Sequence, residues 1–298
     1  MPSHEFATSK PVHLRVAIPA GDIQISVHDS PTVEVDIDTP KDPSFAEKVV
    51  VEHTPSGNAD RVLVELRRTN GFGLRQLFDG MRSEVFADIR VPRGATLELE
   101  TASADVRGTG GFAAARFSTA SGDVEIDHVS GDVDGRTASG DVSVESVDGK
   151  AQVKTASGDV ELGRVGRDGS VASASGDVTI GTASSAVTVK TASGDARVTA
   201  TFADAKLQTA SGTVEIERAK AGSLVLNSVS GDISVGVVQG TALRVNATAV
   251  TGDLSSDIEL SDDAPQRAAG EPQDRLELTA RTVSGNVRIR RAAPAPVA

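Results

Sequence analysis

The feature that most constrains this chain is a short motif, Ser-Gly-Asp or a near copy of it, that returns every 18 residues. A fixed internal period is typical of repeat proteins, in which each copy forms one structural unit that stacks on the next. Ala104 occupies the glycine slot in the first copy. The glycines of the following copies are Gly122, Gly140, Gly158, Gly176, Gly194 and Gly212, and more widely spaced copies follow at Gly231, Gly252 and Gly285.

Between these motifs, apolar and polar residues alternate, as in the stretch from Ala151 to Leu162. Alternation with a period of two predicts β-strands with one buried face. The Gly-Asp step interrupts each run because glycine reaches backbone angles that other residues avoid, and aspartate accepts hydrogen bonds from nearby N–H groups. A second turn signal inside each copy, such as Asp148-Gly149, divides it into two short strands.

The predicted fold is all-β: a single elongated β-solenoid, or β-helix, with 18-residue coils, two short strands per coil and an irregular β N-terminal cap. Equivalent side chains of successive coils would lie about 4.8 Å apart and form buried apolar columns. An antiparallel meander with 18-residue hairpins is the alternative that the pattern leaves open. One predicted column contains Val124, Val142, Val160, Val178, Val214 and Ile233, and another contains Ile126, Val144, Leu162, Ile180, Val198 and Ile216.

Changes in pattern divide the chain into segments. The N-terminal third alternates without the clean period, as expected of a cap that shields the first coil. We expect a flexible N-terminus at 1–11, an irregular β cap at 12–94, the regular solenoid at 95–256, a polar loop insertion at 257–274, final β strands at 275–291 and a disordered tail at 292–298.

Composition excludes several classes of function. Acidic residues number 42 and basic residues 30, and the net charge of -12 opposes binding of a phosphate backbone, so we expect no nucleic acid partner. The chain has no cysteine, which excludes disulfides and thiolate metal sites. No apolar run is long enough for a transmembrane helix, and the first twenty residues lack the apolar stretch of a signal peptide. We therefore expect a cytoplasmic protein without a cofactor.

Aspartates form the strongest candidate site, because they follow the motif glycines in every regular copy up to the sixth. Stacked carboxylates would repel by about 0.9 kcal/mol per neighbouring pair in water. We interpret them first as turn residues, each accepting hydrogen bonds from its own turn. A row of cation sites, with calcium as the preferred ion, is the alternative. The residues of this possible metal column are Asp123, Asp141, Asp159, Asp177 and Asp195.

Threonines three positions before the motif glycines form a second column, and regular threonine arrays are a feature of ice-binding solenoids. Thr101, however, shares its parity with Leu97 and Leu99. Simple alternation therefore points the threonines inward, where their hydroxyl groups can hydrogen-bond, and makes ice binding a minor alternative.

No catalytic residues are predicted. Polysaccharide lyases are the natural enzymes to compare with a β-solenoid, but sugar subsites usually need aromatic platforms, and the chain has neither Trp nor Tyr. The five histidines are scattered and form neither a metal motif nor a nucleophile motif.

An apolar segment interrupts the N-terminal region. We interpret it as a flap over the end of the core, with an exposed contact site for a partner as the alternative. The residues of this possible interaction patch are Phe72, Leu74, Leu77, Phe78 and Met81.

The copies TASGDVSVE, TASGDVELG and SASGDVTIG, with the earlier stretches AGDIQISV and IRVPRGATLELETASADV, resemble the bacterial putative-adhesin family of β-strand-repeat proteins. The resemblance covers nearly the whole chain and is closest in character to actinobacterial members. It implies a right-handed β-solenoid-like fold, a domain of unknown function and no catalytic residues.

Together these observations predict a noncatalytic β-repeat scaffold that binds a protein partner or associates with itself. The alternative is an adhesin-like surface protein exported by an unrecognised route. A lyase-like enzyme and an ice-binding protein are further alternatives, which a cleft with paired acid and base groups and an outward threonine array, respectively, would favour.

Overall fold

The computed structural model describes residues 3–40, 43–66, 85–258 and 274–293. The chain divides into two compact units: unit 1 contains residues 1–149 and 153–158, and unit 2 contains residues 150–152 and 159–298. Strand β14 (Ala151–Lys154) has residues in both units. The predicted segment boundaries remain predictions.

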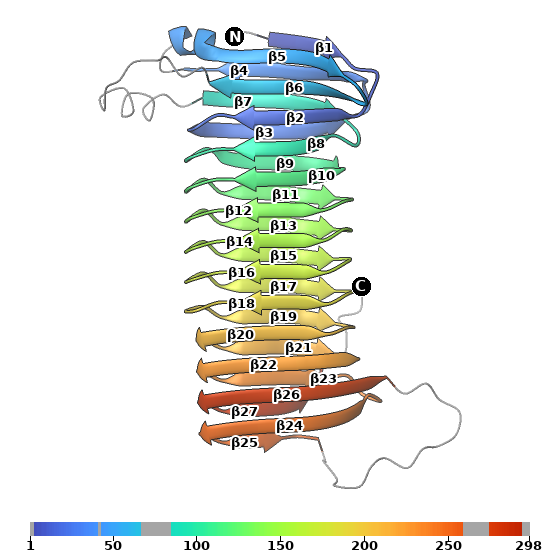
Figure 1. Ribbon diagram of the computed structural model, residues 1–298, viewed down its shortest axis with the longest axis vertical. Coiled ribbons are helices and arrows are strands. Elements are labelled where there is room, and N and C mark those ends of the chain that lie inside the picture. The colour runs from blue at the N-terminus through green and yellow to red at the C-terminus, as the bar shows by residue number, and fades with distance from the viewer. Residues whose placement is uncertain (1–2, 41–42, 67–84, 259–273, 294–298) are drawn as a thin grey trace. The chain divides into compact units, whose positions relative to one another are not determined.

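The regular secondary structure of the described residues is β-strand, apart from one short 3₁₀ helix (Figure 1). That helix is not long and apolar enough to cross a membrane, and no other helix occurs in the described ranges. The elements of unit 1 are β1 (Ser3–Ala7), β2 (Val12–Ala17), β3 (Gly21–His28), β4 (Thr32–Asp38), η1 (Pro43–Lys48), β5 (Val49–Ser56), β6 (Ala59–Leu66), β7 (Val85–Pro92), β8 (Thr96–Glu100), β9 (Asp105–Phe112), β10 (Ala114–Ser118), β11 (Val124–Val129), β12 (Val133–Arg136) and β13 (Val142–Val147).

Unit 2 continues the same alternation of short strands. Two strands near its C-terminal end are ten residues long, longer than those of the regular copies. The elements of unit 2 are β15 (Val160–Val165), β16 (Gly169–Ala172), β17 (Val178–Ala183), β18 (Val187–Lys190), β19 (Ala196–Thr201), β20 (Ala205–Ser211), β21 (Val214–Ala219), β22 (Gly222–Ser230), β23 (Ile233–Val237), β24 (Ala242–Thr251), β25 (Leu254–Ser256), β26 (Arg275–Ser284) and β27 (Val287–Arg291).

The strands belong to two long sheets in which parallel pairing predominates. In unit 1 the first sheet has the order β1-β4-β7-β3-β9-β11-β13 and the second the order β5-β6-β2-β8-β10-β12. In unit 2 the corresponding orders are β15-β17-β19-β21-β23-β27-β25 and β16-β18-β20-β22-β26-β24. The described antiparallel pairs, β1 with β4, β4 with β7 and β5 with β6, all lie in unit 1.

Paired strands of the regular copies join residues that are 18 positions apart. Val124 lies opposite Val142 in unit 1, and Val160 lies opposite Val178 in unit 2, in both cases in parallel strands. The antiparallel meander is therefore wrong for these strands. Every residue of the two predicted apolar columns is at most 2 % exposed, which confirms that these side chains form the core.

The glycine of the repeated motif is needed because the turns of neighbouring coils approach closely there. A Cβ on Gly122 would lie 1.9 Å from the carbonyl oxygen of Ala104, and a Cβ on Gly140 would lie 2.0 Å from that of Gly122. Neither glycine has a positive φ. The predicted reason, an unusual backbone angle, is thus wrong for these copies, and steric exclusion of any side chain replaces it.

The threonines before these glycines point inward, as predicted. Thr119, Thr137 and Thr155 are at most 9 % exposed, and their Oγ1 atoms accept hydrogen bonds from the glycine N–H three residues later at 3.0, 2.9 and 2.9 Å. In unit 2 the Oγ1 of Thr209 instead donates to the carbonyl of Gly194 at 3.1 Å. These hydroxyl groups satisfy buried backbone groups, so they do not form the outward array that an ice-binding surface requires.

Spatial order departs from chain order near one edge of each unit. In unit 1, β3 pairs with both β7 and β9. In unit 2, β26 pairs with both β22 and β24, and β27 pairs with both β23 and β25. The C-terminal strands are therefore inserted between strands that precede them in the sequence.

Candidate functional site

The aspartates of the repeated motif connect successive coils. The N–H of Asp123 donates to Oδ1 of Asp105 at 2.9 Å, and the N–H of Asp141 donates to Oδ1 of Asp123 at 2.8 Å. In unit 2 the same bond joins the N–H of Asp177 to Oδ1 of Asp159, and the N–H of Asp195 to Oδ1 of Asp177, both at 2.8 Å.

The donor is therefore the backbone one coil later, and the prediction of a bond within the same turn is wrong for these carboxylates. At the turn between two strands, no backbone carbonyl of the neighbouring coil accepts a hydrogen bond from the aspartate N–H. The carboxylate of the neighbouring aspartate accepts that bond instead. No group of three or more His, Asp or Glu side chains in the described ranges is arranged to hold a metal ion. Calcium binding by the predicted column stays a prediction.

We expect Asp123→Asn to change the free energy of unfolding by less than about 0.5 kcal/mol, because an amide oxygen accepts the same bond, whereas Asp123→Ala should lower it by about 1 kcal/mol. The chain contains this exchange already, since Oδ1 of Asn286 accepts from the N–H of Asp253 at 2.9 Å. Chemical denaturation of both variants measures the difference. Equal losses in the two variants would show that the charge matters and not the acceptor, and a rise in melting temperature with calcium would support the cation column.

A second, larger cluster of carboxylates covers the outward side of the first sheet in unit 1. Alternation along β4, β7, β3, β9 and β11 buries one set of side chains and turns the other outward. We call the outward set, with Asp123 directly before β11, the acidic face. It contains the nine carboxylates Asp22, Glu34, Asp36, Asp38, Asp88, Asp105, Asp123, Glu125 and Asp127, against the two guanidinium groups of Arg90 and Arg107.

Strand register sets these side chains in rows across the sheet. In one row Asp38 lies opposite Phe86, Phe86 opposite Asp22, and Asp22 opposite Asp105. The next row runs Asp36, Asp88, Gln24, Arg107 and Glu125. Like charges therefore lie beside one another on adjacent strands, an arrangement that is unfavourable unless cations neutralise it.

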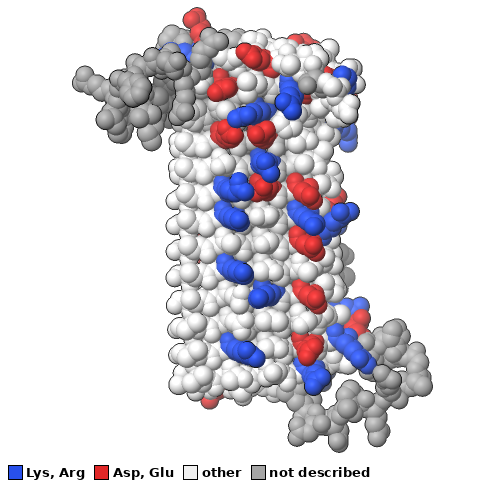
Figure 2. All heavy atoms as spheres, viewed as in Figure 1, with Lys and Arg blue, Asp and Glu red and all other residues white. Residues whose placement is uncertain are grey.

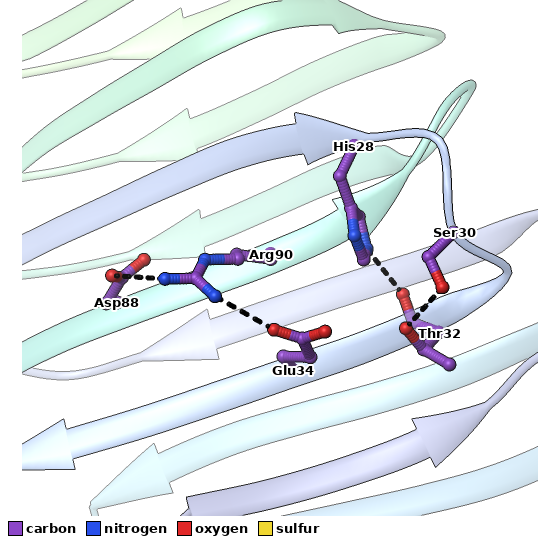
Figure 3. A network of polar contacts seen from close by, with 6 residues as sticks. All are labelled: His28, Ser30, Thr32, Glu34, Asp88 and Arg90. Atoms are coloured by element: carbon purple, nitrogen blue, oxygen red, sulfur yellow. Dashed lines mark hydrogen bonds and ion pairs between the residues drawn. The ribbon is translucent and has the colours of Figure 1, made fainter.

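The two arginines neutralise only part of this charge. Arg90 bridges strands, with Nη1 3.0 Å from Oε2 of Glu34 and Nη2 3.6 Å from Oδ2 of Asp88 (Figure 3). Nη2 of Arg107 lies 2.6 Å from Oε2 of Glu125.

Three further carboxylates of the acidic face have no partner among the residues that the structure describes. Asp22, Asp36 and Asp38 make neither an ion pair nor a hydrogen bond within the described part of the chain. With nine carboxylates and two arginines, the acidic face carries seven excess negative charges when all groups are ionised.

A cavity of about 440 Å³ opens on the acidic face. The ring of Phe86, 38 % exposed, stands at its side and gives the otherwise acidic wall an aromatic surface. An aromatic ring among carboxylates suits the ammonium or guanidinium group of a basic side chain. The lining residues are Asp22, Ile23, Gln24, Phe86, Asp105, Val106, Arg107, Asp123 and Glu125.

The second sheet of unit 1 presents a different surface. Figure 2 shows acidic and basic side chains interspersed there. Arg15 pairs with Glu100 at 3.0 Å, and Arg116 pairs with Asp134 at 3.2 Å. The excess of negative charge is thus larger on the first sheet of unit 1 than on the second.

Another cavity of about 440 Å³ in unit 1 is lined by the turns beside Lys10 and Arg93, but both cations already have acceptors. Lys10 Nζ donates to the carbonyl of Gly57 at 2.8 Å, and Arg93 donates to Asp29. The hydrogen bond from Arg93 lowers the pKa of the Asp29 carboxyl from its ordinary value. The charged groups that line this cavity are therefore already paired, unlike several carboxylates of the acidic face.

The predicted interaction patch, with Phe72, Leu74, Leu77, Phe78 and Met81, lies outside the described residues. The acidic face was not predicted. Its signal is nonetheless present in the sequence, because residues 32–38 read Thr-Val-Glu-Val-Asp-Ile-Asp, with an aliphatic residue at every second position and acids between them. Alternation alone does not show which strands lie beside one another in the sheet.

Comparison with known proteins assigns the family. A family model described as Toastrack DUF4097 matches residues 86–166 and 149–290. No curated protein matches the chain.

Several solved structures resemble it at low identity. A putative adhesin from Bacteroides fragilis is 11 % identical over 97 % of this chain and 96 % of that chain, with a TM-score of 0.40. A putative cell adhesion protein from Clostridium sporogenes is 8 % identical over 97 % and 99 %, with a TM-score of 0.25. A putative lipid binding protein from Parabacteroides distasonis is 11 % identical over 98 % and 96 %, with a TM-score of 0.32.

TM-scores of this size give no support for a shared binding function. The two family matches do not depend on those structures, and together they extend from residue 86 to residue 290, over more than half of the chain. The chain therefore belongs to the Toastrack DUF4097 family.

Proposed function

We propose that this chain is a noncatalytic β-repeat scaffold whose acidic face binds a basic segment of a protein partner. The observation that carries the proposal is a set of carboxylates with no partner in the described ranges, Asp22, Asp36 and Asp38, beside the exposed ring of Phe86. The scaffold in this proposal is a single solenoid with 18-residue coils, which holds the outward side chains at fixed spacings.

A rigid sheet is well suited to such binding. The inward side chains of β3 and β7, among them Ile23, Ile25 and Ile89, are at most 1 % exposed, so the strands are fixed by the core. Outward carboxylates on fixed strands lose little conformational entropy when a partner binds. A basic partner also relieves the repulsion among the unpaired carboxylates, which adds to the affinity and speeds association.

The test compares two double variants that remove the same charge from different sheets. Asp22→Asn with Asp36→Asn should weaken binding of a labelled decalysine peptide by about tenfold, because both carboxylates lie on the acidic face. Glu52→Gln with Glu65→Gln, on the second sheet of unit 1, should leave it nearly unchanged. Fluorescence anisotropy at several salt concentrations measures both.

Equal losses in the two double variants would mean that only net charge matters, and would overturn the proposed face. Failure of the unaltered protein to bind the peptide would do the same. Phe86→Ala tests the aromatic contribution separately, since it removes the ring without changing the charge.

The cytoplasmic location expected from the sequence is part of the proposal. Fractionation of native cells distinguishes it from the alternative, an adhesin-like binding protein at the cell surface. Recovery of the protein in the surface fraction would favour the alternative, and the same acidic face would then serve an external partner.

A further inference from the structure

As far as the structure describes the chain, the last strands of unit 2 leave one edge of each sheet without a further strand. Within the described residues β24 pairs only with β26, and β25 pairs only with β27. β24 is ten residues long and contains no proline. Its outer side therefore presents a row of backbone N–H and C=O groups, which is the template for adding another strand.

The apolar core continues to this edge without a polar layer. The core-facing residues Leu243, Val245, Ala247 and Ala249 of β24 are only half-buried. The residues opposite the first three of them in β26 are Leu276, Leu278 and Ala280, and these are at most 1 % exposed. The difference arises because nothing in the described ranges packs on the outer side of β24.

A row of exposed valines leads to the same edge. Val229, Val283 and Val250 lie side by side on β22, β26 and β24 and are 55 %, 50 % and 70 % exposed. In the earlier copies of the motif this position is alanine. Those alanines are Ala120, Ala138, Ala156, Ala174, Ala192 and Ala210. The larger apolar side chain is thus confined to the three strands nearest the open edge.

From these observations we infer that a second copy of the chain covers this edge, and that the two copies pair through β24 and β25 about a two-fold axis. The proposed two-fold axis runs perpendicular to the sheets. A single rotation about it places β24 antiparallel to the partner's β24 and, at the same time, β25 antiparallel to the partner's β25. Directly opposed residues of antiparallel strands share a face, so each core-facing row meets its own counterpart.

Charge is compatible with this pairing. Arg244 is the only charged residue of β24. When Ala247 lies opposite the partner's Ala247, Arg244 lies opposite the partner's Val250, and the two arginines stay apart. The aliphatic part of the arginine then covers an exposed valine.

The chain's own residues 259–273 are a poorer match to the edge. They contain the acids Glu259, Asp262, Asp263 and Glu271 and the prolines Pro265 and Pro272. Proline has no N–H to donate to a strand ladder, and carboxylates do not suit an apolar row. A second copy offers both the backbone groups and the apolar side chains.

The test is the oligomeric state of the full chain, measured by sedimentation and light scattering over a wide range of concentrations. We expect a dimer. Ala247→Lys places a charge on the core-facing side of the edge and should weaken association by about a hundredfold. Thr248→Lys, one residue along on the outward side of the same strand, is the matched control and should remain dimeric.

Because the chain has no cysteine, a single introduced thiol gives an independent measurement. Asn246→Cys and Thr248→Cys lie on the outward side of β24 near the proposed axis, and one of them should form a disulfide-linked dimer under mild oxidation. Circular dichroism checks that each variant is folded, and the crosslink remains informative if Ala247→Lys is not.

A monomer at every concentration would overturn the inference, as would dimers that survive Ala247→Lys without forming the crosslink. Open-ended polymers would also overturn it, since a two-fold contact closes after two copies. Self-association concerns unit 2 and goes beyond the proposed function, so it can fail while the acidic face still binds decalysine.

Discussion

Replacing Gly140 with alanine is expected to lower the free energy of unfolding by about 3 kcal/mol or more. The added methyl group would lie 2.0 Å from the carbonyl oxygen of Gly122, far inside van der Waals contact. That oxygen belongs to the backbone of the neighbouring coil, so the clash can be relieved only by moving one coil away from the next. Chemical denaturation followed by circular dichroism measures the loss.

Gly111→Ala is the matched control, because it adds the same methyl group in the same unit. The nearest atom to that Cβ is Cδ2 of His128 at 3.5 Å, an ordinary contact. We expect a change of less than about 1 kcal/mol. Similar losses for both variants would show that glycine is needed for its backbone freedom in general and not for the close approach of coils.

The second large effect concerns the pairing of Phe117 with Gly135 on adjacent strands β10 and β12. A Cβ on Gly135 would lie 2.2 Å from Cζ of the Phe117 ring, which is itself only 2 % exposed. Gly135→Ala should therefore lower the free energy of unfolding by about 2 kcal/mol. Phe117→Leu, which shortens the side chain, should lower it by about 1 kcal/mol.

The double variant is expected to be more stable than the sum of the two losses predicts, by about 1–2 kcal/mol, because leucine leaves room for the added methyl group. A double-mutant cycle measured by denaturation gives this coupling directly. Additive losses would contradict the proposed exchange of volume between the two positions. Gly135 thus leaves room for the Phe117 ring on the adjacent strand.

The strands and their buried faces were largely predictable from the sequence. Alternation identifies which side of a strand is buried, and the 18-residue period places Val124 and Val142 in equivalent positions. The same pattern is also compatible with antiparallel hairpins, so excluding them in favour of parallel coils needed the structure. Inward threonines were predictable for the same reason as the core valines, since Thr101 follows the parity of Leu99.

Strand order near the edges was not predictable, because alternation states which face is buried and not which strand lies beside it. β26 follows β24 in the sequence, yet it pairs with β22 as well. The pairing of β4 and β7 on the acidic face depends in the same way on contacts between residues distant in the sequence. Acidic residues of β4 and β3 that look unrelated in the sequence therefore share one surface.

The aspartates show a further limit of the same kind. A carboxylate after glycine is typical of a local turn, and nothing in a single copy distinguishes a donor in that turn from one in the next copy. Only the stacking of coils places the N–H of Asp123 beside Oδ1 of Asp105. Periodicity located these residues but did not give their hydrogen-bond partners.

The insertion of β26 between β22 and β24 has a consequence for biosynthesis. Chains are made from the N-terminus, and early parts begin to fold while later parts are still being added. β26, the strand that separates β22 from β24, is synthesised after both of them. Any pairing of β22 with β24 that forms before β26 has been made would have to come apart again, so the native order of these strands can form only after β26 is synthesised.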